Sequence, residues 1–244
     1  MRHFSAQDLL WLWEVGQGQD ALERAMTILG AAFPEMSRDA LLDMGLGQQH
    51  VRLLQVRQAL FGPVMQCFSE CPQCQERLEY TLDAAALAVD GAGAAEQEAY
   101  ETAIGEYTLR FRVLTCRDLA AVRACHDVQT ARAVLAQHCL LQIERAGAAS
   151  AEPTLPEAVI VQLAEQVLAR DPQAETLLDL GCPTCGHGWQ ATLEYGTFLW
   201  AELSAQARRL LHEVDALARA YGWREADILA MSTFRRQMYL KLVI

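Results

Sequence analysis

The chain has 244 residues, of which 52% are apolar, and its formal net charge is −11. This length allows one large domain or two small ones, and the apolar fraction excludes a disordered chain. The acidic balance disfavours nonspecific nucleic-acid binding, which needs clustered positive charge. No stretch approaches the roughly 18 uncharged apolar residues of a membrane span, and the first residues lack the apolar core of a signal peptide. We therefore expect a cytoplasmic bacterial protein.

Residues 1–62 are predicted to form an N-terminal helical segment. Ser5 and Asp8 have the spacing of a capping box at the start of a first helix. Apolar residues then recur at helical spacing on both sides of a glycine-containing break at 16–18. A further helix runs to Gly62, where a Gly-Pro pair ends it.

The pattern changes to β in residues 63–115, which are predicted to form a first cysteine knuckle and a β-hairpin. A Cys-Pro-Gln-Cys turn at 71–74 separates a β-compatible stretch from strict apolar alternation over 78–82. Residues 100–104 and 107–113 alternate in the same way around a Gly-Glu pair, as in a hairpin.

Residues 116–174 are predicted to form a helical insertion. Two stretches rich in Ala and Gly, 84–99 and 145–153, are expected to be a weakly structured excursion and a linker. The predicted helices are 117–126, 128–143, and one that begins at a Thr154–Glu157 capping box and ends near Asp171.

The β pattern returns in residues 175–196, which carry a second Cys-Pro-x-Cys turn between two predicted strands. Residues 197–244 are predicted to form a C-terminal helical segment. The expected fold is therefore α+β and mostly α-helical, with helical ends joined by a split zinc ribbon in one composite domain. The predicted C-terminal helices are 198–220, 224–231 and 233–243.

The two Cys-Pro-x-Cys turns point to a metal site. A two-residue spacer in a tight turn lets both thiolates face one ion, and two such turns supply the four sulfurs of a tetrahedral zinc site. Gly186, after the second turn, suits backbone N–H bonds to sulfur, whereas Gln75 at the matching place is less suitable. The expected cofactor is a structural Zn²⁺ with the ligands Cys71, Cys74, Cys182 and Cys185.

A redox dithiol is the main alternative, because Cys-Pro-x-Cys also resembles glutaredoxin-type motifs. Such a motif is expected at the N-terminus of a helix, which lowers the pKa of the thiol, whereas both turns here lead into predicted strands. The remaining cysteines have no ligand spacing and are expected in the core, where free cysteine is common. They are Cys67, Cys116, Cys125 and Cys139.

Cysteine and histidine neighbours leave two further alternatives. Cys67 or His187 could substitute for one ligand, although four cysteines already complete a zinc shell. His126 and His138 lie beside cysteines, but no orienting acid or oxyanion motif accompanies them. The sequence also contains no phosphate-binding Gly-rich loop, no Gly-x-Ser-x-Gly and no His-Glu-x-x-His, so we expect no catalytic residues and no enzymatic activity.

The C-terminal segment is mildly basic within an acidic chain, through Arg208-Arg209, Arg235-Arg236 and Lys241. A solvated helix face explains this charge, and a docking surface for an acidic partner is the alternative. The tryptophans on amphipathic helices are expected in the core or at an interface. They are Trp11, Trp13 and Trp200.

A series of short motifs runs in order along nearly the whole chain: Leu9-Leu10-x-x-Trp13-Glu14, Phe61-Gly62-Pro63, Cys71-Pro-x-Cys74, Arg117-Asp118-Leu119, Cys182-Pro-x-Cys185-Gly186-His187-x-Trp189, Phe198-Leu199-Trp200-x-Glu202, Tyr221-Gly222-Trp223-x-Glu225, Ile228-Leu229 and Arg235-Arg236-x-x-Tyr239-Leu240. In this order they resemble a family encoded in contractile-tail gene clusters of myovirus-like prophages, tailocins and extracellular contractile injection systems. Its members are similar to the baseplate hub assembly chaperones of myoviruses.

The resemblance implies an assembly or baseplate-associated role without catalysis, with baseplate and hub subunits as protein partners. The leading hypothesis is a non-enzymatic assembly factor or component of a contractile-tail baseplate, located in the cytoplasm or incorporated into a phage-like particle. Zinc is expected to fix the N-terminal helices against the C-terminal helices and so to present an apolar, tryptophan-bearing surface. A zinc-ribbon protein that binds nucleic acid or acts in transcription, and a thiol oxidoreductase, are the alternatives.

Overall fold

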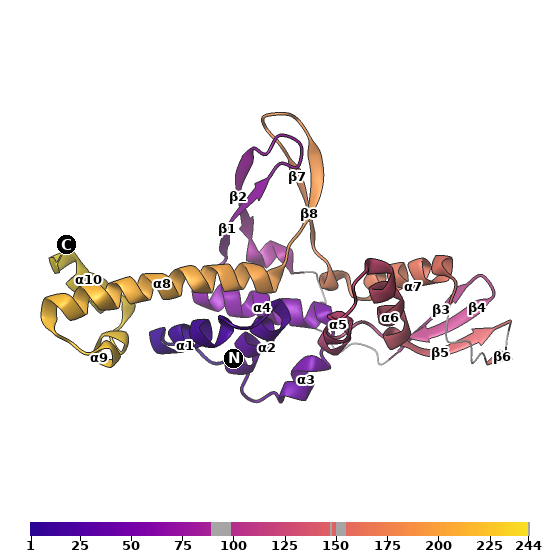
Figure 1. Cartoon of the computed structure of the whole chain (residues 1–244), viewed down its shortest axis with the longest axis horizontal. Helices are drawn as coiled ribbons and strands as arrows, with labels where there is room; N and C mark the ends of the chain where they lie inside the picture. The colour runs from indigo at the N-terminus through magenta and orange to yellow at the C-terminus, as the bar shows by residue number, and fades with distance from the viewer. Residues whose placement is uncertain (89–98, 147, 150–154, 244) are drawn as a thin grey trace. The chain divides into compact units, whose positions relative to one another are not determined.

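A computed structural model describes residues 1–88, 99–146, 148–149 and 155–243 (Figure 1). The chain divides into two compact units. Unit 1 contains residues 1–37 and 194–244, and unit 2 contains residues 38–193. Helices and short antiparallel sheets occur together, which confirms the predicted, mostly helical α+β class. No helix in the described part of the chain has the length and hydrophobicity needed to cross a membrane.

Unit 1 is helical, and its two N-terminal helices pack against the long helix α8. The predicted capping box is confirmed, since Ser5 Oγ accepts from the Asp8 N–H and the Asp8 carboxylate accepts from the Ser5 N–H. Ser232 caps the last helix, since its hydroxyl accepts from the Arg235 N–H at 3.3 Å. The helices are α1 (Ala6–Gly16), α2 (Ala21–Ala32), α8 (Tyr195–Tyr221), α9 (Glu225–Leu229) and α10 (Thr233–Val243).

Apolar side chains hold α1 and α2 against α8. The fully buried residues of this unit include Leu12, Leu29, Leu199, Leu203 and Leu210. Burial of each leucine contributes roughly 1.5–3 kcal/mol, so ordinary hydrophobic packing accounts for the contact between the N-terminal and C-terminal helices. The structure therefore supplies a cause for this contact other than the zinc clamp that the sequence suggested.

The tryptophans of unit 1 differ in their surroundings. Trp200 packs on the end of α1, where an added Cβ at Gly16 would lie 2.3 Å from its ring. The Arg24 guanidinium lies 4.5 Å from the centroid of the same ring and donates to the Gly16 carbonyl. Trp11, by contrast, is 50% exposed. Trp200 thus stabilises the helix packing, and Trp11 lies on the surface.

Unit 2 contains a helical base from which two β-hairpins project. The first hairpin follows α4 directly, and its strands pair antiparallel from Val64↔Asp83 to Glu70↔Arg77. The second pairs from Leu177↔Thr192 to Gly181↔Gly188. The elements of this part are α3 (Arg38–Leu42), α4 (Leu46–Phe61), β1 (Val64–Glu70), β2 (Arg77–Asp83), η1 (Ala84–Leu87), η2 (Pro172–Ala174), β7 (Leu177–Gly181) and β8 (Gly188–Thr192).

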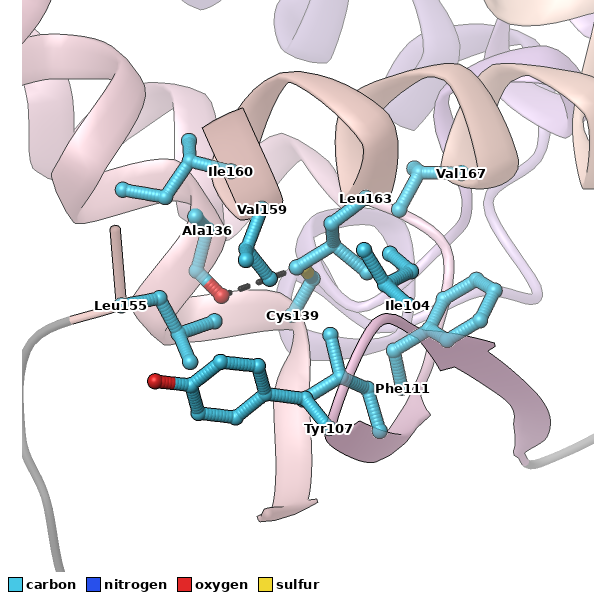
Figure 2. Packing of buried hydrophobic residues seen from close by; sticks show 11 residues of the cluster. Ile104, Tyr107, Phe111, Ala136, Cys139, Leu155, Val159, Ile160, Leu163 and Val167 are labelled. Atoms are coloured by element: carbon cyan, nitrogen blue, oxygen red, sulfur yellow. Dashed lines mark hydrogen bonds between the residues drawn. The ribbon is translucent and has the colours of Figure 1, made fainter. Parts of the chain in front are cut away.

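The rest of unit 2 is an antiparallel sheet in the strand order β3-β4-β5-β6 together with three helices. Figure 2 shows its apolar cluster, in which residues such as Phe111 from β4 meet Leu163 and Val167 from α7. The elements are β3 (Tyr100–Ile104), β4 (Tyr107–Phe111), α5 (Cys116–Val122), α6 (Val128–Cys139), β5 (Leu140–Arg145), β6 (Ala148–Ala149) and α7 (Glu157–Arg170).

The predicted helix over 128–143 is wrong at its C-terminal end. Helix α6 ends at Cys139, and Leu140–Arg145 form β5, which pairs with β4. Apolar residues fit a helix face or a pleated strand equally well, and the free edge of β4 supplies backbone hydrogen-bond partners. The predicted helical insertion therefore also contains strands. The capping role expected of Thr154 and most of the excursion at 84–99 lie outside the described residues.

Candidate metal centre

The four predicted ligand cysteines lie at the tips of the two hairpins. One pair occupies the turn between β1 and β2, and the other occupies the turn between β7 and β8. Figure 1 shows the two hairpins projecting together with their turns adjacent. Residues more than 100 positions apart in the sequence thus meet at one place, as the duplicated motif predicted. The four are Cys71, Cys74, Cys182 and Cys185.

Both turns have the same backbone hydrogen bonds. In the first, the Cys71 N–H donates to the Glu76 carbonyl, and the Gln75 N–H donates to the Cys71 carbonyl, each at 2.9 Å. The second turn repeats both bonds at the same length among the matching residues Cys182, Gly186 and His187. The turns are therefore structural repeats as well as sequence repeats.

The fourth residue after each first cysteine has a left-handed backbone conformation. Gly186 has φ = 73° and Gln75 has φ = 62°. A residue with a side chain pays roughly 1–2 kcal/mol for this conformation, which glycine avoids. Gln75 is thus a locally strained position in the first turn, in agreement with the expectation that it suits the turn less well than glycine.

The sulfur positions fit a tetrahedral ion. All four Sγ atoms lie within 4.8 Å of one another. Cys71 Sγ is 3.7 Å from Cys185 Sγ, and Cys74 Sγ is 3.5 Å from Cys182 Sγ, so close sulfur contacts join the two hairpins. Four sulfurs at about 2.3 Å from a central zinc form a tetrahedron with edges of about 3.8 Å. A disulfide would need about 2.05 Å, and all four cysteines are free.

The electrostatics of the cluster favour a bound cation. Backbone N–H groups of Cys185 and Thr184 lower the pKa of the Cys182 thiol to about 7. The Glu76 N–H lowers the pKa of Cys74, but desolvation and the neighbouring sulfurs outweigh it and raise this pKa to about 12. Four thiolates cannot form so close together without a compensating charge, which a divalent metal supplies when thiolates coordinate it.

Arg57 anchors the base of the first hairpin. Its guanidinium is almost wholly buried and donates to the carbonyls of Gly62 and Val64, each at 2.6 Å. These bonds join the end of α4 to the start of β1, so they set the direction in which the hairpin leaves the helix. The sequence reasoning missed this residue, since an arginine on a helix carries no signal of burial.

Asp171 and Gln173 anchor the base of the second hairpin. The buried Asp171 carboxylate accepts from the Gly47 N–H at 2.8 Å, at the positive end of the α4 dipole. A side chain at Gly47 would meet this carboxylate, since an added Cβ would lie 1.8 Å from Oδ1. The Gln173 side-chain amide donates to the Leu87 carbonyl at 3.2 Å, and the backbone carbonyl of Gln173 lies 2.9 Å from His50 Nδ1. Both hairpins are therefore fixed to α4.

The hairpins bury few of their side chains, and the buried ones on β1 are Met65 and Cys67. Along β2, β7 and β8, exposed residues alternate with residues that are only half-buried. In the described part of the chain β1-β2 and β7-β8 are separate two-stranded sheets, with no hydrogen-bond ladder between them. Isolated two-stranded hairpins are marginally stable in water. The sulfur cluster therefore joins the tips of two sheets that share no backbone ladder.

The other cysteines lie outside the cluster. Cys67, Cys116 and Cys139 are buried, as expected, whereas Cys125 is only half-buried. Desolvation raises the pKa of both Cys116 and Cys139 to about 12, so neither thiol is poised as a nucleophile. Figure 2 shows Cys139 among apolar side chains, where its thiol donates to the Ala136 carbonyl at 3.2 Å.

Two of the histidines considered as alternatives, His138 and His187, have other contacts. His187 stacks on Trp189, with ring centroids 6.1 Å apart, and only its backbone joins the knuckle. His138 Nδ1 lies 3.3 Å from the carboxylate of Asp118, which is held by Arg112. The His187 ring is thus stacked on an indole, and the His138 ring lies beside a carboxylate.

Comparison with known proteins gives one family match. A family model described as T4 bacteriophage base plate protein matches residues 9–197 of this chain. The matched range includes both cysteine turns and ends in the first turn of α8. No curated protein and no solved structure gives a significant match.

Proposed function

We propose, from the premise that this chain belongs to the T4 bacteriophage base plate protein family, that it is a non-enzymatic assembly factor or component of a phage-like contractile-tail baseplate. One structural Zn²⁺ stabilises its fold. Its partners are baseplate and hub subunits, and it acts in the bacterial cytoplasm, where it assists hub assembly as a chaperone or enters the finished particle.

The convergence of four sulfurs from two separate hairpins carries the zinc assignment. Cys71, Cys74, Cys182 and Cys185 are the ligands in this proposal, and their spacing agrees with tetrahedral coordination. A site closed by four thiolates leaves no open position for a substrate or a reactive water. The ion therefore supplies stability rather than catalysis.

Zinc would cross-link two hairpins that share no backbone hydrogen bonds. Arg57 and Asp171 fix the bases of the hairpins to α4, and the ion fixes their tips. A ribbon held at both ends is a rigid projection, which suits a protein whose task is to hold other subunits in a defined geometry. The apolar and aromatic residues Val64 and Phe68 are exposed along β1 and are available to such a subunit.

The geometry favours zinc over a thiol oxidoreductase. Each Cys-Pro-x-Cys turn is followed by a strand, β2 or β8, and not by the helix N-terminus that activates redox dithiols. Close sulfur contacts also run between the two motifs, as one shared ion requires.

Metal analysis combined with alkylation tests the chemical part of the proposal. Protein purified without added metal should contain about one zinc per chain, and its cluster thiols should resist iodoacetamide until a strong chelator is added. Cys125 is the internal control, because it lies outside the cluster and should react at the same rate in both conditions. Protein without stoichiometric metal, whose cluster thiols alkylate at once, would contradict the zinc assignment.

Deletion of the gene from a strain that produces contractile tails tests the biological part. We expect sheath and tube assemblies without complete baseplates in electron micrographs, restored by the wild-type gene. Mass spectrometry of purified particles then distinguishes a retained component from a transient assembly factor. Normal particles in normal numbers from the deletion strain would contradict a role in baseplate assembly.

A further inference from the structure

A groove runs between α8 and α10 in unit 1, outside the cysteine cluster. Its volume is about 760 Å³. The side chains that line it include Ala205, Arg208, Arg209 and His212 from α8, and Gln237 and Lys241 from α10. The small side chain of Ala205 leaves room between the longer ones, so the groove is open to a ligand of side-chain width.

The groove is positively charged. Neither Arg208 nor Lys241 forms an ion pair with any residue in the described ranges, and both side chains are exposed. Glu213 is the acidic residue of the lining, and it is almost wholly buried. Its carboxylate is shared by Arg236 at 2.6 Å and Arg209 at 3.3 Å, so two guanidinium groups neutralise one negative charge.

This ion pair corrects one expectation from the sequence. Arg235 and Arg236 are adjacent, and both were candidates for a basic surface. Arg236 is only 2% exposed, because it pairs with Glu213 inside the unit, whereas Arg235 is exposed and lies over the Tyr239 ring. The basic surface therefore consists of the groove residues and not of the arginine pair.

An apolar stripe borders the groove on α10. Phe234, Met238 and Leu242 lie at positions i, i+4 and i+8, and they are 76%, 47% and 75% exposed. This spacing places them on one face of the helix, next to the face that carries Lys241. Three large apolar side chains in a row on a solvent-facing helix are typical of an interaction surface.

We propose that the α8–α10 groove and the apolar stripe on α10 bind an acidic amphipathic helix of a partner protein. In helix-in-groove recognition an amphipathic helix lays its apolar face on an apolar surface of the receptor, and the stripe on α10 offers such a surface. Carboxylates on the flank of the partner helix would pair with Arg208, Arg209 and Lys241. The inference concerns a surface in unit 1 and does not depend on the metal.

Charge favours this occupant over nucleic acid. The groove offers few cations, and the whole chain carries a net charge of −11, which repels a polyanion at longer range. A short helix with a few carboxylates needs only local complementarity, and its apolar face uses the stripe that a phosphate backbone would leave uncovered.

Peptide binding to the full-length protein tests the proposal. The probe is a fluorescein-labelled helical peptide with Leu along one face and Glu on the flanks, and the matched peptide has Lys in place of every Glu. We expect the Glu peptide to bind, with affinity that falls as salt is raised, and the Lys peptide to bind at least tenfold more weakly. The double variant R208E/K241E should reverse this preference, and F234S/M238S should weaken the Glu peptide at least tenfold.

Matched controls make the result decisive. Arg38→Glu reverses an exposed charge in unit 2, away from the groove, and should leave the affinity for the Glu peptide unchanged. Circular dichroism and metal content should be unaltered in every variant, because all the changed side chains are exposed. Equal binding of both peptides, or unchanged affinity in R208E/K241E, would overturn the proposal. Tighter binding of single-stranded DNA than of the Glu peptide, or self-association abolished by R208E/K241E, would also overturn it.

Discussion

The two paired hairpins of unit 2 and the helices of unit 1 are stabilised in different ways. In unit 1, buried leucines on α1, α2 and α8 form a continuous apolar contact. Most hairpin side chains are exposed or half-buried, and four sulfurs cluster where the tips meet. One chain thus combines a hydrophobically packed unit with a projection whose rigidity we propose to depend on metal coordination.

Cys182→Ser should produce the largest difference between the two regions. Structural zinc contributes roughly 10–16 kcal/mol of apparent binding free energy in small zinc domains, so loss of one ligand should release the metal and separate the hairpin tips. Elemental analysis should give near-zero zinc, while the helices of unit 1 keep their circular dichroism signal. Cys125→Ser is the matched control and should retain the metal. Full zinc content in the Cys182 variant would show that this residue is not a required ligand.

Leu203→Ala should do the reverse of Cys182→Ser: it should destabilise unit 1 and leave the zinc site intact. Leu203 is fully buried in unit 1, and truncation of a buried leucine costs roughly 2–5 kcal/mol. We expect a lower denaturant midpoint for unit 1 and unchanged zinc content. Leu211→Ala on the same helix removes a side chain that is 38% exposed and should cost much less. Loss of zinc in the Leu203 variant would mean that the two regions are not energetically separate.

Asp118 stabilises unit 2 through a partly buried ion pair that does not involve the cysteine cluster. Desolvation raises the pKa of this carboxyl group, but hydrogen bonds from Arg112 and Thr115 outweigh it and lower the pKa to about 2 from its usual 3.8. A lowered folded-state pKa contributes stability that is complete above the unfolded-state pKa and is lost as pH falls from about 5 to 2. The shift corresponds to about 2 kcal/mol.

Asp118→Asn should therefore cost about 2 kcal/mol at pH 7 and progressively less toward pH 2. Urea unfolding of chelator-treated wild type and variant across this range measures the effect without interference from metal release. A constant difference between the two proteins at every pH would contradict the assigned role of the Asp118 ion pair.

The smallest expected effects concern the two left-handed positions of the knuckles. Gly186→Ala should destabilise the second turn by about 1–2 kcal/mol, since no atom lies within 4 Å of an added Cβ and only the backbone strain counts. Gln75→Gly should relieve the same strain in the first turn and stabilise it by up to about 1 kcal/mol. Chelator competition measures both as changes in zinc affinity. Equal affinities in wild type and both variants would mean that the turns tolerate either residue.

The sequence predicted the parts of the fold that have local signals. Glycines and capping residues marked most helix ends, and the Ser5–Asp8 box is present as predicted. The duplicated cysteine motif predicted which four residues would meet, because a tight turn between strands fixes where both thiols lie. These features depend on residues that are close in sequence, and short-range rules describe them well.

Features that depend on distant residues could not be predicted. Strand β5 forms because Leu140–Arg145 meet the edge of β4, and the apolar pattern alone fits a helix as well. Asp171 and Arg236 are buried with partners distant in sequence, although charged residues are usually exposed. Arg57 is buried as well, against carbonyls just beyond the end of its helix. Their roles follow from tertiary contacts that leave no periodic signal.

Hydrogen exchange of the wild-type protein with and without a strong chelator tests the central claim most directly. Zinc is proposed to join the tips of the two hairpins, so chelation should remove amide protection from β1–β2 and β7–β8 and leave α8 protected. Restored zinc should restore the protection. Hairpin amides that stay equally protected after complete metal removal would contradict the claim that metal coordination holds this projection together.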